Sequence, residues 1–225
     1  LVGPKNVVEL AKKMGIKSHL KPVLSLPLGA NEVSMEELIQ SYMVMANNGI
    51  KVNPVGILEI EDRDGVSLYK NRLKEERVID KNIVAVLTQM LANAVNYGTG
   101  RGAKIPRPMA GKTGTTSDYK DAWFIGYVPQ LVCATWVGND DNTPMHNVTG
   151  GWIPARLWKA FMNEALKSVK AQAFHKPKGL IQANVNWETG YLVSDQTPSN
   201  TKTSVLEFWS SKVPTKKDTL ASIQS

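Results

Sequence analysis

Three β-prone runs follow one another closely between residues 110 and 138, and this succession constrains the fold more than any other feature of the sequence. The runs predict strands at 110–116, 122–128 and 131–138. Because the gaps between them are too short for a crossover helix, the three strands are expected to form an antiparallel meander. A helix expected from about residue 154 would cover this sheet with one apolar face. That face consists of Leu157, Trp158, Phe161, Met162, Ala165 and Val169. The sequence therefore predicts an α+β fold.

Two helices are predicted near the start of the chain. Pro4 and Gly15 stand in the start and stop positions of a short apolar stripe. A second helix is indicated by Ser34 and Glu37, which have the spacing of a capping box, and it ends at Asn48, just before a glycine. The residues expected to face a core are Leu38, Ile39, Tyr42 and Met45.

A hairpin and a third helix follow. Residues 52–69 alternate between short β-prone runs around a turn that contains Asp64 and Gly65, a pattern typical of an exposed hairpin. Asp80 can cap the third helix, which ends before Gly98. Its predicted buried face comprises Ile83, Val84, Leu87, Met90 and Leu91.

The composition suits one packed domain with an appended tail. The chain has 225 residues, 42% of them hydrophobic, and no apolar run approaches the roughly 20 residues that span a bilayer. Residues 1–174 are assigned to the domain. Residues 175–225 are rich in Lys, Thr, Ser and Pro, and they predict a loosely packed extension with one apolar anchor at residues 206–209. The net charge of +7 is spread along the chain without a nucleic-acid motif, so it indicates solvation and no nucleic-acid partner.

The segment from Gly111 to Thr116 concentrates a cation, hydroxyl groups and glycines beside apolar strands. A glycine within a strand leaves the backbone open to an extended peptide, and Gly114 would be that opening. Lys112 supplies positive charge. Thr113 and Thr115 can donate hydrogen bonds to a substrate carboxylate.

A phosphate-binding loop is the competing interpretation of this segment. Gly111, Lys112 and Thr113 match the end of that motif, but its first glycine would fall at Pro106, which supplies no amide. Gly114 would also interrupt the helix that must follow. The sequence therefore favours a substrate-binding strand over a nucleotide site.

In order and spacing, a series of motifs resembles the transpeptidase domain of class A penicillin-binding proteins. The matching segments are residues 26–29, 46–49, 98–103, 112–115, 121–127, 136–138 and 150–151, Pro154-Ala155, Trp158 and Phe161-Met162. Together they cover nearly everything up to about Phe174. The tail matches more loosely, through Thr189-Gly190 and residues 207–209 before Pro214.

The resemblance implies a serine enzyme that cross-links peptidoglycan. Such an enzyme attacks D-Ala-D-Ala stem peptides, forms an acyl-enzyme, and passes the acyl group to an amine of a neighbouring stem. β-Lactams acylate the same serine. The resemblance gives Lys112 a role in the serine–lysine network and gives Thr113 and Thr115 the substrate carboxylate. It also implies that the backbone N–H of Thr115 is one oxyanion-hole donor. No cofactor is expected, and the resemblance places the parent protein outside the cytoplasm, on a membrane anchor.

The catalytic serine itself is not expected in this chain. Ser-x-x-Lys strings begin at Ser18, Ser67 and Ser199, but none opens a helix that would hold its lysine in an apolar pocket. No Ser-x-Asn string is present. We therefore expect the nucleophile on an upstream part of the same domain, and we expect the chain alone to be inactive. The free edge of the 131–138 strand should be covered by that upstream part, by a neighbouring molecule or by the extension after Ala171.

Other sites and functions receive less support. His19, His146 and His175 lack metal-ligand spacing, and the acidic run at 140–142 lacks the continuation of a calcium loop, so no metal site is predicted. Two alternatives to the transpeptidase stay open. The chain could be a non-catalytic module that binds peptidoglycan or a partner, or it could be part of a serine β-lactamase.

Overall fold

The computed structural model describes residues 2–176, 179–209 and 213–218. The α-helices are α1 (Pro4–Met14), α2 (Met35–Ala46), α3 (Lys81–Asn96) and α4 (Ile153–Ala165), and the 3-10 helices are η1 (Leu26–Leu28) and η2 (Arg101–Ala103). The short strands are β1 (Ile50–Val52), β2 (Glu59–Glu61), β3 (Ser67–Lys70) and β4 (Glu75–Arg77). The longer ones are β5 (Ala110–Thr115), β6 (Asp121–Val128), β7 (Leu131–Gly138), β8 (Leu180–Asn186) and β9 (Thr203–Trp209).

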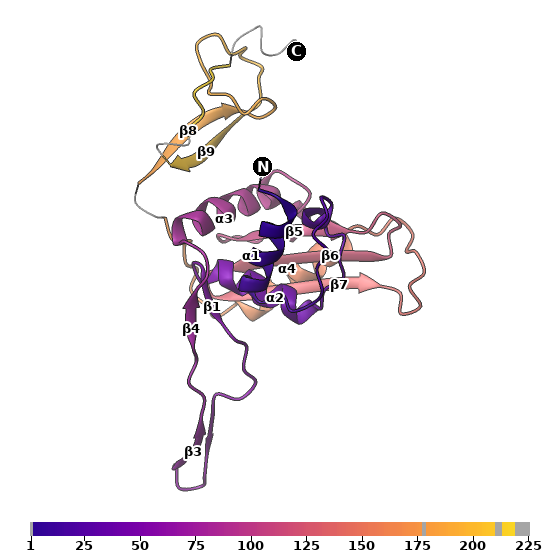
Figure 1. The fold of residues 1–225 in the computed structure, drawn as a ribbon, viewed down its shortest axis with the longest axis vertical. Helices are drawn as coiled ribbons and strands as arrows, with labels where there is room; N and C mark the ends of the chain where they lie inside the picture. The colour runs from indigo at the N-terminus through magenta and orange to yellow at the C-terminus, as the bar shows by residue number, and fades with distance from the viewer. Residues whose placement is uncertain (1, 177–178, 210–212, 219–225) are drawn as a thin grey trace.

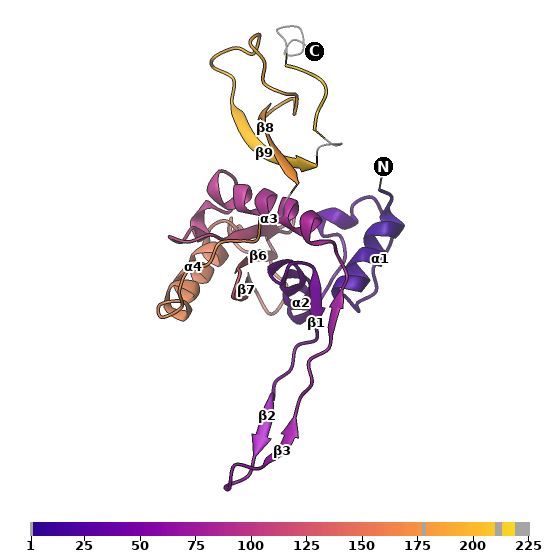
Figure 2. The ribbon, with the colours of Figure 1, turned by 90° about the vertical axis from the view of Figure 1, so that its left-hand side faces the viewer.

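The predicted meander is confirmed. Strands β5, β6 and β7 form an antiparallel sheet in that order, and each boundary lies within one residue of the prediction. Figure 2 shows α4 on one side of this sheet and α1 and α2 on the other. The predicted α+β class, with an antiparallel sheet covered by helices, is therefore correct.

The sheet has a core on each face. On one face Phe124 packs edge-on against Trp158 of α4, with ring centroids 5.3 Å apart. On the other face Tyr127 lies against Tyr42 of α2, and its hydroxyl pairs with that of Thr88 of α3 at 2.8 Å. Burial raises the pKa of Tyr42 to about 12. Both faces of β6 are thus occupied, which agrees with its near-continuous apolar sequence.

The predicted start of α2 is confirmed in detail. The Ser34 hydroxyl accepts from the Glu37 amide, and the Glu37 carboxylate accepts from the Ser34 amide, which completes a capping box. The same carboxylate also accepts from the hydroxyl of Ser18 at 2.6 Å. Hydrogen bonds from the Ser18 hydroxyl and from nearby amides hold the pKa of Glu37 below its usual value. Glu37 therefore ties the segment after α1 to the first turn of α2.

The buried faces of α3 and α4 differ in part from the prediction. On α3, Ile83 is 50% exposed and Met90 is 60% exposed, whereas Val84 is buried as expected. On α4, Leu157 and Phe161 are 50% and 54% exposed. Of the remaining residues predicted on this apolar face, Trp158 and Met162 are buried and Ala165 is exposed. Val169 is exposed and lies beyond the end of α4, so the helix is shorter than predicted. Each helix touches the sheet along one narrow stripe, so the adjacent apolar stripe stays in solvent.

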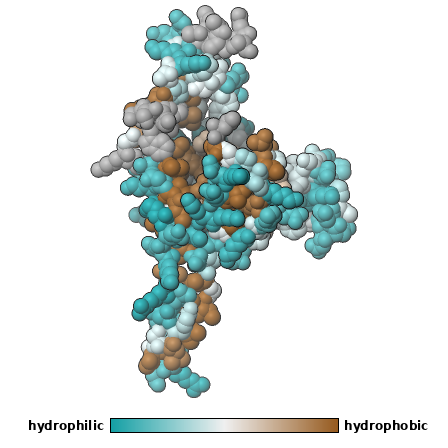
Figure 3. All heavy atoms as spheres, in the orientation of Figure 1, coloured by the Kyte–Doolittle hydropathy of each residue, from teal (hydrophilic) through white to brown (hydrophobic). Residues whose placement is uncertain are grey.

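The predicted hairpin projects from the domain as an arm. Strands β2 and β3 pair at its end, beyond the β1–β4 pair at its base, and the arm points away from the sheet in two perpendicular views (Figures 1 and 2). Its exposed apolar residues include Val55, Ile57, Leu58, Ile60, Val66, Leu68, Tyr69 and Leu73. Figure 3 shows these hydrophobic surfaces along the arm. The arm therefore adds little to the buried core.

The C-terminal region contains a two-stranded sheet of its own, which the sequence analysis did not anticipate. Strands β8 and β9 pair antiparallel, and the segment between them adds a bridge between Val185 and Leu192. Asp218 is fully buried, and its carboxylate accepts a hydrogen bond from the side-chain amide of Asn186 at 2.8 Å. This unit lies at the end of the molecule opposite the arm (Figures 1 and 2). Among the described residues this unit pairs with neither edge of the main sheet. The edge of β7 that faces away from β6 therefore has no strand partner in that part of the chain.

None of the helices within the described ranges is long and apolar enough to cross a lipid bilayer.

Candidate functional site

The segment Ala110–Thr115 is an edge strand, as the sequence predicted. Strand β5 pairs with β6 on one side, and its other edge pairs with no strand in the described part of the chain. Ala110 is buried with Val84 of α3, whereas Lys112 and Thr115 are exposed. The strand therefore enters the core at one end and is open to solvent at the end that carries the polar side chains.

The two faces of β5 present different groups. Directly opposed residues of an antiparallel pair share a face, and Gly114 opposes Trp123. Lys112 and Gly114 thus lie on the face with Trp123, and Trp136 continues that face at a centroid distance of 6.3 Å from Trp123. Thr113 and Thr115 lie on the face that α4 covers. The cation and the hydroxyl groups consequently reach the free edge from opposite faces.

The Lys112 ammonium stays at the strand. Its Nζ donates to the carbonyl oxygen of Thr113 at 2.9 Å. An ammonium has three donors, so this contact leaves capacity for an anionic partner. Lys112 is thereby placed to contribute positive charge at the open edge.

Each threonine hydroxyl of the strand is held by another element. Oγ1 of Thr113 lies 2.7 Å from Oγ1 of Thr99, in the linker after α3. Oγ1 of Thr115 accepts from the amide of Gly150, in the loop before α4, at 3.1 Å. The side chains that the sequence assigned to carboxylate binding are therefore fixed in position.

Two glycines let the loop before α4 reach the strand. A Cβ on Gly150 would collide with the carbonyl oxygens of Trp123 and Gly114, and one on Gly151 would collide with that of Thr99. The methyl group of Thr113 would lie 3.7 Å from a Cβ atom on Gly151. Only residues without a side chain permit such close backbone approach.

The structure contradicts a phosphate-binding loop at this position. Residues 111–115 form a strand, and the next element is strand β6 instead of a helix. A helix N-terminus that could cradle a phosphate is therefore missing from the end of the motif.

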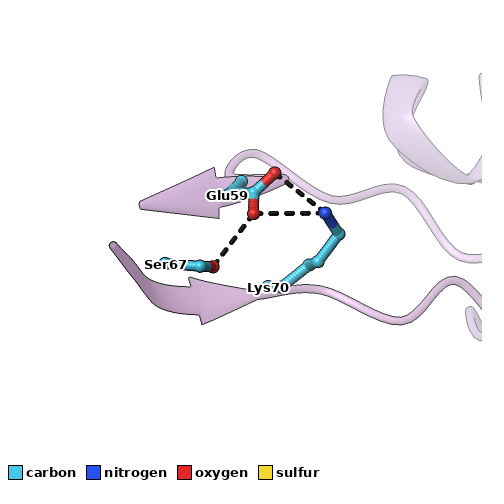
Figure 4. Close-up of polar contacts among 3 residues, drawn as sticks. All are labelled: Glu59, Ser67 and Lys70. Carbon is cyan, nitrogen blue, oxygen red and sulfur yellow. Dashed lines mark hydrogen bonds and ion pairs between the residues drawn. The ribbon is translucent and has the colours of Figure 1, made fainter. Parts of the chain in front are cut away.

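The string that begins at Ser67 forms a structural cluster on the arm. Ser67 donates to Glu59 at 2.9 Å, and the Lys70 ammonium lies 3.1 Å from the other oxygen of the same carboxylate (Figure 4). All three residues are exposed. The cluster is a cross-strand ion pair, and it lacks the apolar pocket that an activated serine needs.

The other Ser-x-x-Lys strings also lie outside helix starts, and one of them begins at Ser117 in the turn between β5 and β6. Ser18 follows the end of α1 and donates its hydroxyl proton to Glu37, and Ser199 lies in a turn between β8 and β9. None of these serines begins a helix that contains its lysine. Within the described residues, none of them therefore has the helix-start position that an activated nucleophile of this type needs.

No group of three or more potential metal ligands among His, Cys, Asp and Glu comes together within the described residues. In the acidic run at 140–142, Asp141 accepts hydrogen bonds from the amide and hydroxyl of Thr143. These bonds lower the pKa of Asp141 and close the turn. The carboxylate is therefore engaged in local loop structure.

Comparison with known protein families identifies the family to which this chain belongs. The family described as penicillin binding protein transpeptidase domain matches residues 10–163, which include both glycines and the whole main sheet. The chain belongs to this transpeptidase family. Penicillin-binding protein 2D of Bacillus subtilis is 34% identical over 84% of the chain, and penicillin-binding protein 1A of Aquifex aeolicus is 36% identical over 82%. These names confirm the class A resemblance.

Solved transpeptidase structures share the fold. Penicillin-binding protein 1A from Haemophilus influenzae covers 96% of the chain with a TM-score of 0.81 at 24% identity, and the chain spans 38% of that structure. The PonA1 protein from Mycobacterium tuberculosis covers 79% with a TM-score of 0.72 at 26% identity, and the chain spans 53% of it. The chain spans 28% of the Bacillus subtilis relative and 26% of the Aquifex aeolicus relative.

The sequence analysis missed the roles of Thr99 and Gly150. Both belong to short motifs that matched the transpeptidase family, but no local pattern indicated which atoms they contact. Thr99 and Thr113 are 14 residues apart, and Gly150 and Thr115 are 35 apart. The available signal was the presence of glycines beside each of them.

Proposed function

We propose that this chain forms the substrate-binding side of a peptidoglycan cross-linking D,D-transpeptidase. The enzyme acts on D-Ala-D-Ala stem peptides through an acyl-serine intermediate and is blocked by β-lactams. The observation that carries the proposal is the open edge of β5, where Lys112 and the hydroxyls of Thr113 and Thr115 lie together. Membership in the transpeptidase family supports it.

An extended stem peptide would lie along the free edge of β5 as an added strand. Its terminal carboxylate would accept from the hydroxyls of Thr113 and Thr115, and Lys112 would supply compensating charge. The Thr115 amide would donate to the developing oxyanion, a contact whose loss in acyl transfer costs roughly 100-fold to 1,000-fold in rate. These residues bind and polarise the substrate; the nucleophile comes from elsewhere.

The attacking serine is proposed to lie on an upstream part of the same domain, because no Ser-x-x-Lys string in this chain opens a helix. That part would also pair with the free edge of β7. The parent enzyme is proposed to work outside the cytoplasm on a membrane anchor. No cofactor or metal enters the reaction as proposed.

Covalent labelling with a fluorescent penicillin tests whether the substrate strand lies in this chain and the nucleophile in an upstream segment. The chain alone should stay unlabelled, whereas a polypeptide that joins it to an upstream segment with Ser-x-x-Lys and Ser-x-Asn should be labelled at the serine of the first motif. Substituting Thr115→Val in that polypeptide should slow labelling. Labelling of the isolated chain at any serine would overturn the proposal.

A binding role without chemistry is the second candidate, and the positions of Ser18, Ser67 and Ser199 outside helix starts favour it for the chain alone. Amide chemical shifts would report it: N-acyl-D-Ala-D-Ala should perturb residues 112–115 in the isolated chain. A serine β-lactamase is separated by the lifetime of the acyl-enzyme, which should be long in a transpeptidase and short in a β-lactamase.

A further inference from the structure

The two hydroxyl contacts at β5 differ in which partner can donate. A backbone amide can only donate, so Oγ1 of Thr115 must accept from Gly150 and keeps its own proton. In the Thr99–Thr113 pair the two hydroxyl oxygens lie 2.7 Å apart, one O–H donates to the other oxygen, and either hydroxyl can be the donor. A bound carboxylate has no proton and can only accept. Its arrival therefore favours the arrangement in which Thr99 donates and Thr113 keeps its proton for the ligand.

We infer that Thr99 is a positioning residue that makes Thr113 a donor. With Thr99 donating to Thr113 and Gly150 donating to Thr115, two O–H groups on one face of the strand are directed to a single terminal carboxylate. The inference rests on the proposed function, because it assigns the oriented hydroxyls to the carboxylate of the stem peptide. Chains of hydrogen bonds also polarise one another, so the donation from Thr99 strengthens the bond from Thr113 to the anion.

The backbone around Thr99 is held firmly enough for this role. The following amide, that of Gly100, donates to the Ala94 carbonyl at 3.0 Å at the end of α3. On the other side, Gly151 lies so close that any Cβ there would collide with the Thr99 carbonyl oxygen. Thr99 is thus fixed between the end of α3 and the loop before α4, and the position of its hydroxyl follows from the fold.

Substitution of Thr99 by Val distinguishes a positioning role from a role in folding, because valine keeps the shape of threonine and removes its hydroxyl group. Binding of N-acetyl-D-Ala-D-Ala and of its C-terminal amide to the isolated chain can be compared by amide chemical shifts at residues 112–115. We expect T99V to weaken binding of the acid by about tenfold and to leave binding of the amide nearly unchanged. The acid-to-amide ratio should recover in T99S, which restores the hydroxyl.

The control is T197V, which removes the hydroxyl that accepts from the Ser194 amide in the C-terminal unit and should leave both affinities unchanged. An equal loss for acid and amide in T99V, or no loss for either, would overturn the inference. If the wild-type chain binds neither ligand at residues 112–115, the result would instead contradict the proposed function itself. A melting temperature measured for every variant identifies any loss of binding that follows from unfolding.

Discussion

The backbone of Gly150 lies directly against that of Gly114, so that a Cβ atom on Gly150 would stand 2.5 Å from the Gly114 carbonyl oxygen. The carbonyl oxygen of Trp123 is closer still. The loop before α4 therefore rests on the backbone of β5 and β6, with no side chain between them. This contact explains how an amide of the loop reaches the Thr115 hydroxyl.

Substitution of Gly150 by alanine should destabilise the domain by about 1–3 kcal/mol, the usual cost of overpacking, because the methyl group forces the loop away from the strand. Urea unfolding would measure the change. Gly56→Ala is the matched control, since nothing lies within 4 Å of its virtual Cβ. Equal stability of the two variants would contradict the close approach.

The arm should be dispensable for folding. Replacing residues 54–73 by Asn-Gly leaves the β1–β4 pair closed by a short turn and removes mainly exposed side chains. We expect the free energy of unfolding to change by less than about 1 kcal/mol. A loss of several kcal/mol in urea unfolding, or loss of the cooperative transition, would show that the arm stabilises the domain.

Cys133, the one cysteine in the sequence, should react slowly in the folded chain. Burial raises the pKa of its thiol to about 11, so little thiolate is present at pH 8. Alkylation by iodoacetamide at pH 8 should be about 100-fold slower in buffer than in denaturant, where the pKa returns to about 8.5. The substitution C133S gives the blank, and rapid alkylation of the native chain would refute the prediction.

The sheet was predictable because its signals are local. The apolar runs of β6 and β7 are bounded by turns, and Ser34 with Glu37 specifies a helix start through contacts within one turn. The buried faces of α3 and α4 were harder, since Leu157 and Trp158 belong to adjacent stripes with the same spacing, and only the position of the sheet decides which stripe is buried. The sequence alone could not make that choice.

The candidate site likewise has features that the local sequence predicts and features that depend on long-range packing. The strand position of residues 110–115 and the exposure of Lys112 follow from composition and spacing, whereas the contacts of Thr99 and Gly150 depend on how distant segments pack. The small sheet of β8 and β9 escaped prediction because its polar sequence resembles that of a loose tail. Long-range contacts therefore account for most of what the sequence did not reveal.

Tyr127 should make the fold sensitive to alkali. Burial raises the pKa of its phenol, and the hydrogen bond with Thr88 lowers it only in part. The folded pKa lies above the unfolded value of about 10, so the unfolded chain loses this proton first. The stability associated with the protonated phenol is complete below pH 10 and is lost as the pH rises above it. Tyr127→Phe should therefore reduce the alkaline loss of stability.

At neutral pH the same substitution should destabilise the chain by about 1–2 kcal/mol, because it leaves the buried Thr88 hydroxyl without its partner. The deficit of Tyr127→Phe relative to wild type should then shrink between pH 9 and pH 11, as urea unfolding at each pH would measure. Tyr97→Phe, at an exposed position, is the control and should follow the wild-type pH dependence. A deficit that stays constant across this range would mean that the Tyr127 phenol titrates alike in the folded and unfolded chain, contrary to its burial between α2 and α3.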